Sequence, residues 1–197
     1  MKTPLRRLAV LALSMVALMS CGSEHPTALP ELRSPPETPA NDLLLTGVLQ
    51  SLVSLNGLQR TTPLATPITV SKAIGSAGGT LAIPQAGVTV VIPKGALSKT
   101  TTVSMTARAG SLVAYDFAPH GVTFATPLVF TQQLRGTDAS LLTAPFLQLG
   151  YYSDPGLLSK TTALVSELIG GVTNVLSWTF TGSIPHFSGW VVTCGRR

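Results

Sequence analysis

Charged side chains are scarce in this sequence. They make up 11% of the 197 residues, less than half of the roughly 25% that is typical of soluble domains. Outside the extreme N-terminus lysine and arginine form no cluster, so no basic patch for nucleic acid or acidic lipid is predicted. A polar surface built mainly from Ser, Thr, Gly and Pro suits an all-β extracellular module better than a helical cytosolic protein.

Cysteine and histidine are also rare. Cys21 and Cys194 are the only cysteines, which excludes a disulfide framework. The three histidines, His25, His120 and His186, lack the spacing of metal ligands, so no metal site is expected. The acidic residues are few and scattered, and no Gly-x-Ser-x-Gly elbow occurs. Neither a paired-carboxylate enzyme nor a serine hydrolase is therefore predicted, and no cofactor is indicated.

The longest apolar run, residues 8–19, is too short for the roughly 20 residues of a membrane-spanning helix. Three basic residues precede it, so residues 1–20 have the pattern of a signal peptide. The run ends in Leu-Met-Ser-Cys at residues 18–21, which resembles the lipobox of bacterial lipoproteins. The resemblance implies cleavage before Cys21, lipidation of its sulfur and anchoring in the cell envelope. Because Gly22 follows, it implies the outer membrane in a Gram-negative cell. The alternative is an ordinary secretory signal followed by a chance cysteine.

Residues 21–67 have the composition of a tether. Prolines recur between residues 22 and 40, which favours an extended, semi-rigid spacer. Apolar residues at positions i, i+4, i+8 and i+11 then predict a short amphipathic helix over residues 41–60. Such a helix can self-associate, lie at a membrane interface or pack on the domain that follows, and the sequence leaves these options open.

Residues 68–197 are expected to form the folded domain, which has a normal domain size. Residues 102–107 alternate strictly between inward apolar residues and outward hydroxyls, the period of a half-buried strand. Residues 176–181 alternate too, which places two aromatic residues on the core face. Residues 157–169 fit a short helix as well as strands. Many short strands between Gly and Pro turns predict an antiparallel β-sandwich. Further strand candidates are residues 81–83, 88–92, 113–117, 128–132, 147–152 and 189–193.

Three motifs in this domain resemble those of one family. Residues 78–97 carry paired glycines, a strand and Ile-Pro-Lys-Gly-Ala-Leu, and residues 117–127 contain Pro-x-Gly-x-x-Phe-x-x-Pro. Residues 186–188 are His-Phe-Ser. In this order they resemble the ZU5 domain of zonula occludens proteins, netrin receptors and ankyrins. The resemblance covers residues 74–192 and implies a β-sandwich that contacts a protein partner. The motif residues are Gly78, Gly79, Ile92, Pro93, Gly95, Ala96, Pro119, Gly121, Phe124 and Pro127.

His186-Phe187-Ser188 also resembles the self-cleavage motif of certain ZU5-containing death-domain proteins. By this resemblance His186 deprotonates Ser188, whose oxygen attacks the carbonyl of Phe187. Strand pairing explains the same tripeptide, with His186 and Ser188 on one face and Phe187 on the other. The tripeptide alone shows neither a strained peptide nor an oxyanion donor. The structural interpretation is therefore preferred.

Two smaller hypotheses concern the remaining aromatic and thiol groups. Tyr151, Tyr152 and Trp190 could form a stacking platform for a carbohydrate or another small ligand, although buried aromatic residues are commoner. Cys194, three residues from the C-terminus, is interpreted as a buried residue of the terminal strand.

Overall fold

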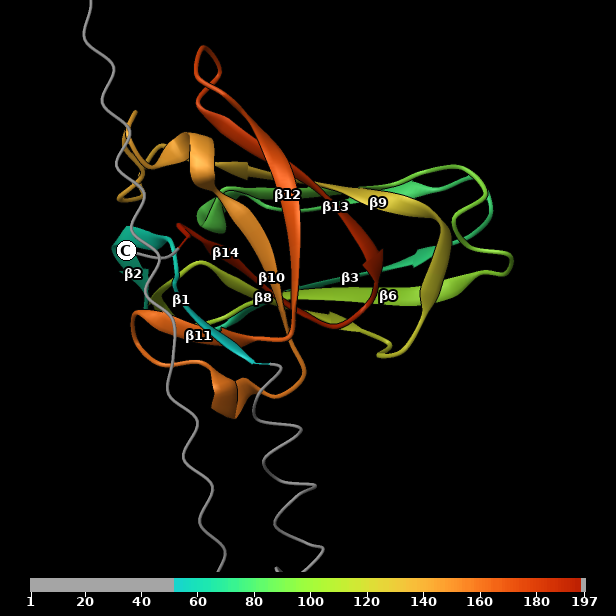
Figure 1. Cartoon of the computed structure of the whole chain (residues 1–197). Coiled ribbons are helices and arrows are strands. Elements are labelled where there is room, and N and C mark those ends of the chain that lie inside the picture. The colour runs from blue at the N-terminus through green and yellow to red at the C-terminus, as the bar shows by residue number, and fades with distance from the viewer. Residues whose placement is uncertain (1–51, 196–197) are drawn as a thin grey trace, which may run out of the picture. The chain divides into compact units, whose positions relative to one another are not determined.

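The computed structural model describes residues 52–195, which form an all-β fold with no α-helix in this range (Figure 1). The predicted signal peptide, Cys21 and the Pro-rich segment lie outside the described residues. The strands are β1 (Val53–Asn56), β2 (Gln59–Leu64), β3 (Ile68–Ile74), β4 (Gly79–Ile83), β5 (Val88–Ile92), β6 (Thr101–Ala107), β7 (Gly110–Leu112), β8 (Ala114–Ala118), β9 (Thr123–Gln133), β10 (Gln148–Tyr152), β11 (Thr162–Val165), β12 (Glu167–Asn174), β13 (Thr179–His186) and β14 (Gly189–Thr193). Short 3-10 turns occur at η1 (Pro84–Ala86), η2 (Ala144–Phe146) and η3 (Pro155–Leu157).

Ten strands form one antiparallel sheet in the order β3-β6-β8-β14-β10-β12-β13-β9-β5-β4. The sheet curls over on itself, because strands far apart in this order meet through their side chains. Tyr115 of β8 packs edge-on against Phe130 of β9, with 5.6 Å between the ring centroids. A Cβ added to Gly79 of β4 would lie 3.2 Å from the Ile74 side chain of β3, although β3 and β4 are the two end strands of the order. The predicted all-β fold of antiparallel, sandwich-like layers is therefore confirmed.

The core lies between the two layers and follows the strand period. Val103, Met105 and Ala107 of β6 are buried, as the alternation of residues 102–107 predicts. The buried Tyr115 hydroxyl donates a hydrogen bond to the side-chain oxygen of Gln132, 2.5 Å away. Burial raises the pKa of Tyr115 to about 12, because the interior disfavours the phenolate. The Tyr115 hydroxyl inside this core is thus neutral and hydrogen-bonded.

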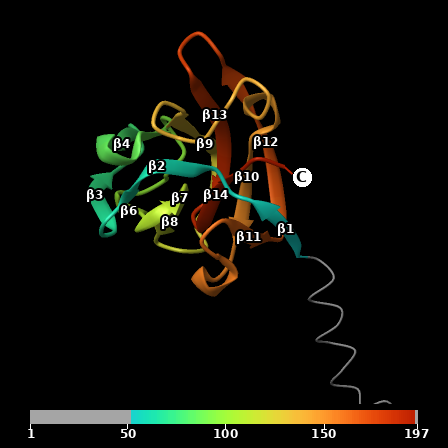
Figure 2. The ribbon, with the colours of Figure 1, turned by 90° about the vertical axis from the view of Figure 1, so that its left-hand side faces the viewer.

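One half of the large sheet carries a second layer on its outer face. β1 pairs with β11 and β2 pairs with β7, and Figure 2 shows β1 and β2 crossing in front of β14. A second hydrophobic cluster fills the space beneath these strands. Its buried members are Leu55, Leu112, Ala114, Tyr152, Ala163, Val165 and Val191.

The helix predicted over residues 41–60 is wrong for the part that the structure describes. Residues 53–56 form β1 and residues 59–64 form β2, while residues 41–51 lie outside the described range. Leu55 and Leu58 are buried in the two hydrophobic clusters, so this segment belongs to the folded domain. The predicted domain start at residue 68 is therefore too late, since pairing with β11 and β7 captures the preceding residues.

Two ambiguous or incorrect strand assignments are also resolved. Residues 157–169 contain β11 and the start of β12, not a helix. The strand predicted over residues 176–181 begins only at Thr179. The side chain of Asn174 accepts the backbone N–H groups of Leu176 and Ser177, at 2.9 and 3.1 Å, which closes a turn before β13. Leu176 therefore points into solvent.

Burial contradicts the hypothesis of an aromatic stacking platform and corrects the one about Cys194. Tyr152 and Trp190 are buried, so with Tyr151 they form no exposed stacking platform. Cys194 is only half-buried and follows the end of β14, so its assignment to the terminal strand is wrong. Within residues 52–195 no helix has the length and hydropathy needed to cross a membrane.

Candidate functional site

The first sequence motif forms a packed corner at the ends of β3, β4 and β5. Gly78 has a φ of +78°, and a Cβ at this position would lie 2.3 Å from the carbonyl oxygen of Ile92. The Gly95 N–H donates to the Ser76 carbonyl oxygen at 2.8 Å, so the β3–β4 turn is fastened to the segment after β5. Ile92 and Ala96 are buried. This motif therefore shapes the fold and presents no reactive group. Its remaining members, Gly79 and Pro93, belong to the same corner.

The second and third motifs meet, although about 65 residues separate them. Gly121 donates its N–H to the Phe187 carbonyl oxygen at 3.2 Å, and Phe187 donates its own N–H to the Val122 carbonyl oxygen at 2.8 Å. The buried Phe187 ring stacks on Phe117, with centroids 5.9 Å apart. It also meets Phe124 edge-on at 4.7 Å. We call Phe117, Phe124 and Phe187 the Phe187 cluster.

Two prolines complete the second motif. Pro119 follows a cis peptide bond in the turn after β8, next to Gly121, whose φ is +78°. Pro127 is exposed within β9. Both therefore serve chain geometry beside the Phe187 cluster, and neither faces a cavity.

His186 ends β13 and has a defined environment. Its Nε2 lies 3.2 Å from a carboxylate oxygen of Glu167 on β12. The ring also contacts Tyr151 and Trp190, with centroids 5.0 and 5.1 Å away. The indole N–H of Trp190 donates to the His186 carbonyl oxygen at 3.2 Å. A carboxylate and two aromatic rings thus fix the orientation of the imidazole.

His186-Phe187-Ser188 links two strands instead of lying within one. Phe187 and Ser188 form a bend between β13 and β14, so the strand pairing predicted for the whole tripeptide is wrong. The Phe187 carbonyl already has a hydrogen-bond donor, Gly121, and His186 has a carboxylate partner. Among the described residues no hydrogen bond joins the Ser188 hydroxyl to His186. The arrangement can orient a base and polarise a carbonyl, but the nucleophile does not contact the base.

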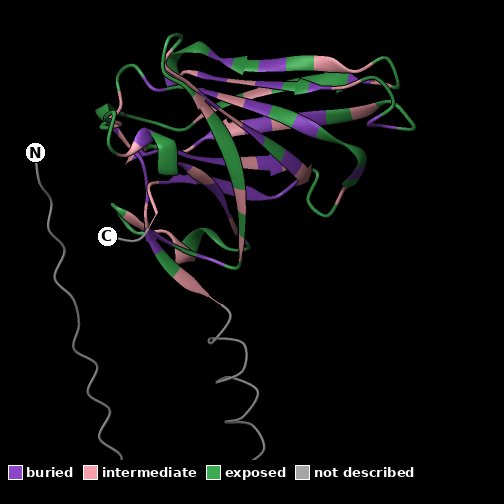
Figure 3. Cartoon of the chain, turned by 45° about the horizontal axis from the view of Figure 1, so that its top comes forward, coloured by how far each residue is buried: buried purple, intermediate pink, exposed green. Residues whose placement is uncertain are grey.

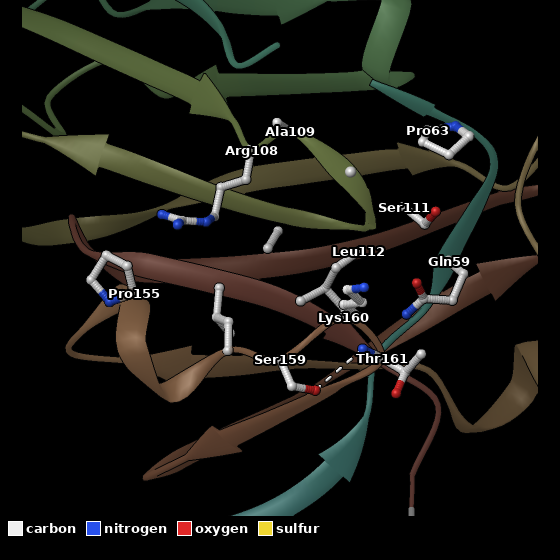
Figure 4. Close-up of a pocket in the computed structure, with 13 residues that line it drawn as sticks. Gln59, Pro63, Arg108, Ala109, Ser111, Leu112, Pro155, Ser159, Lys160 and Thr161 are labelled. Carbon is white, nitrogen blue, oxygen red and sulfur yellow. Dashed lines mark hydrogen bonds between the residues drawn. The ribbon is translucent and has the colours of Figure 1, made fainter. Parts of the chain in front are cut away.

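One hollow is lined by no residue of the three motifs (Figure 4). Its volume is about 700 Å³, and β2, β7 and the segment after η3 surround it. Arg108 on its wall pairs with Asp116 at 2.8 Å. None of the described residues forms a group of three His, Cys, Asp or Glu side chains that could hold a metal ion.

The outer faces of the two half-sheets differ. Figure 3 shows exposed and buried stretches alternating along the strands. On β4, β5, β9 and β13 the outward side chains pair across the strands in two rows. Among residues 52–195 no second layer of strands, such as the one that β1 and β2 form on the other half, covers these side chains. We call this surface the open face. It consists of Thr80, Ala82, Thr89, Val91, Val129, Thr131, Thr181 and Ser183.

This architecture defines an all-β domain of curled antiparallel sheet with a structural corner and a buried aromatic cluster. Residues 70–129 match the family model of the ZU5 domain. This segment is therefore similar to a ZU5 domain, as the first two motifs predict, and such a domain suggests a protein-interaction module. The matched segment includes both motifs and ends before His186. No curated protein matches the chain.

Proposed function

We propose that this chain is a lipid-anchored protein of the bacterial cell envelope whose β-sandwich binds a protein partner and turns over no substrate. The observation that carries the binding role is the open face. All eight of its side chains are uncharged, and a partner that covers them removes no charge from water. Its rows of hydroxyl and valine side chains favour a protein surface over a small ligand, which needs a concave pocket.

The contrast between the two half-sheets supports the same assignment. β14 is buried along its whole length, because β1 and β11 cover the outer side of that half. The open face keeps Val91 and Val129 at the surface, as direct neighbours in the register. Exposed apolar side chains that adjoin one another mark interaction sites more often than isolated ones do.

The anchoring half of the proposal depends on the N-terminal sequence. Residues 18–21 resemble a lipobox, and a basic segment with an apolar run precedes them. A diacylated Cys21 would hold the domain stably at a bilayer, where a single acyl chain binds only marginally.

One experiment in a Gram-negative host tests both halves. The full-length chain is labelled with palmitate and carries a photo-crosslinking amino acid in place of Val129. We expect palmitate in the membrane fraction, its loss in Cys21→Ser, and a discrete crosslinked product. The same crosslinker at Ser71, exposed on β3, is the control and should give none. Unlabelled protein would contradict anchoring, and identical products from both positions would contradict the open face.

Self-cleavage between Phe187 and Ser188 is a second candidate function. Two contacts favour it. The Gly121 N–H donates a hydrogen bond to the Phe187 carbonyl oxygen, and the Glu167 carboxylate pairs with His186. His186 would take the proton of the Ser188 hydroxyl, and the oxygen would attack the Phe187 carbonyl carbon. The peptide C–N bond would break as the nitrogen gains that proton. Water would then hydrolyse the ester to a Phe187 carboxylate and the Ser188 hydroxyl, which releases a fragment that begins with the Ser188 amine.

The mass of the mature chain decides between the two candidates. Binding without turnover predicts one intact mass under denaturing conditions. Self-cleavage predicts a separate fragment from residue 188 to residue 197, which includes β14. That fragment would disappear in Ser188→Ala and decrease in Glu167→Gln. A fragment that persists in Ser188→Ala would point to an external protease and contradict self-cleavage.

A further inference from the structure

Large apolar side chains project from two loops of the domain. Leu141, Leu142 and Phe146 lie between β9 and β10, and Val175 and Leu176 form the turn between β12 and β13. Leu142 and Leu176 leave 82% and 90% of their surface exposed. We call these five side chains the apolar tips. Single exposed apolar residues are ordinary, whereas five on two loops that touch need a reason.

The two loops are fastened together. The Thr173 hydroxyl donates to the Ala144 carbonyl oxygen at 2.6 Å, which joins the end of β12, just before the turn, to η2. Asn174 caps the turn that carries Leu176. In the other loop the Ser140 N–H donates to the Thr143 hydroxyl oxygen at 2.9 Å. Their backbones are thus fixed before anything binds, which lowers the entropic cost of binding.

Both loops lie at the same end of the sheet. Figure 1 and Figure 2 show the β12–β13 turn and the η2 loop together, away from β1 and β11. Beside the η2 loop, between it, β12 and the residues after β14, lies a hollow of about 580 Å³ with no charged residue in its lining. Residues 139–153 and 168–185 contain no Asp, Glu, Lys or Arg. The nearest acidic residue before the η2 loop, Asp138, accepts the Gln59 N–H at 2.9 Å.

We propose that the apolar tips insert into the surface of a lipid bilayer. The tips protrude, so a protein partner would need a matching concavity, whereas a bilayer takes in separate apolar side chains without one. The tips and the residues within 139–153 and 168–185 are uncharged, so insertion of the tips themselves desolvates no ion. Burial of leucine and phenylalanine surface supplies the driving force. The proposal goes beyond the protein-binding role and uses a different surface from the open face.

The anchoring proposed above is compatible with this contact. From residue 21 to residue 51 the chain has 31 residues, which span at most about 100 Å when extended. That length exceeds the diameter of a domain of this size, so an anchored domain can turn its tips toward the same membrane. The contact of the apolar tips with a bilayer requires no lipid anchor, so the test uses a chain without one.

The test uses the mature chain with Cys21→Ser and sedimentation with vesicles of phosphatidylethanolamine and phosphatidylglycerol. We expect the protein to sediment with the vesicles equally at 0.1 and 0.5 M NaCl, because apolar insertion is not screened by salt. Leu142→Ser with Leu176→Ser should lower the partition coefficient about tenfold or more. Both side chains are exposed, so folding is retained, and unchanged circular dichroism verifies this. Val91→Ser with Val129→Ser, on the open face, is the matched control and should bind like the parent.

Three results would overturn the proposal. The first is that the protein does not sediment with vesicles. The second is that the control variant loses vesicle binding as much as the Leu142 and Leu176 variant does. The third is that the protein forms a dimer without lipid, and that the Leu142 and Leu176 changes abolish this dimer. The last result would assign the tips to a second copy of the chain. The first and the third result leave the open face untouched, because crosslinking at Val129 tests that surface separately, whereas an equal loss in the control variant would assign the vesicle contact to the open face as well.

Discussion

Replacing Phe187 with alanine is expected to lower the free energy of unfolding by about 3–5 kcal/mol. The ring is buried and contacts Phe117 and Phe124, with centroids 5.9 and 4.7 Å away. Its removal leaves a cavity that the neighbouring strands cannot close, since backbone hydrogen bonds to Gly121 and Val122 hold that segment in place. Urea titration at neutral pH, followed by tryptophan fluorescence, measures the loss.

Phe146→Ala is the matched control, because Phe146 is 66% exposed. Its free energy of unfolding should change by less than about 0.5 kcal/mol. Phe187→Leu keeps most of the volume and should lose less than the alanine variant. A Phe187→Ala loss below about 1 kcal/mol would mean that the Phe187 cluster does not stabilise the fold.

The fold class could be predicted because its causes are local. Alternation in residues 102–107 appears as buried Val103, Met105 and Ala107 in β6, and the glycine and proline turns fall where the strands end. The corner formed by the first motif could also be predicted, since Gly78 and Gly95 both adopt positive φ. Local sequence specifies these features without reference to distant parts of the chain.

The helix predicted over residues 41–60 shows where local pattern is insufficient. Leu52 and Leu55 satisfy a helical spacing in the sequence, yet the chain pairs Val53 with Val165 and Asn56 with Thr162. Strands β1 and β11 are more than 100 residues apart, and no window of sequence contains both. Tertiary pairing therefore overrides the local helical period.

The surroundings of His186 were unpredictable for the same reason. Glu167 and Tyr151 reach His186 because β10 pairs with β12 in a register that places Tyr151 opposite Glu167. The sequence shows neither that register nor the meeting of Gly121 with Phe187. The His-Phe-Ser tripeptide was visible as a motif, but its carboxylate partner and its carbonyl donor depend on long-range pairing.

Alanine substitutions at three glycines distinguish backbone strain from steric clash as the cause of the glycine requirement in the first motif. Gly78 and Gly95 belong to the motif, and Gly170 of β12 is the control. Gly78→Ala is expected to lower the free energy of unfolding by about 2–4 kcal/mol. The residue has a φ of +78°, and its new Cβ would lie 2.3 Å from the Ile92 carbonyl oxygen. A backbone oxygen cannot rotate away as a side chain can, so the corner itself must move. Urea titration against the parent chain measures the loss.

Gly95→Ala and Gly170→Ala isolate the two contributions. Gly95 has a φ of +81° but nothing within 4 Å of the added Cβ, so only the conformational cost of about 1–2 kcal/mol is expected. At Gly170 the added Cβ meets nothing within 4 Å, and φ is not positive. Alanine there should be neutral or stabilising by about 0.5–1 kcal/mol. Equal losses at Gly78 and Gly95 would show that the β3–β4 turn is not packed against Ile92. The contact of the β3–β4 turn with Ile92 joins both ends of the first motif. A loss of stability that increases in the order Gly170, Gly95, Gly78 would therefore explain why the motif needs glycine at Gly95 and at Gly78.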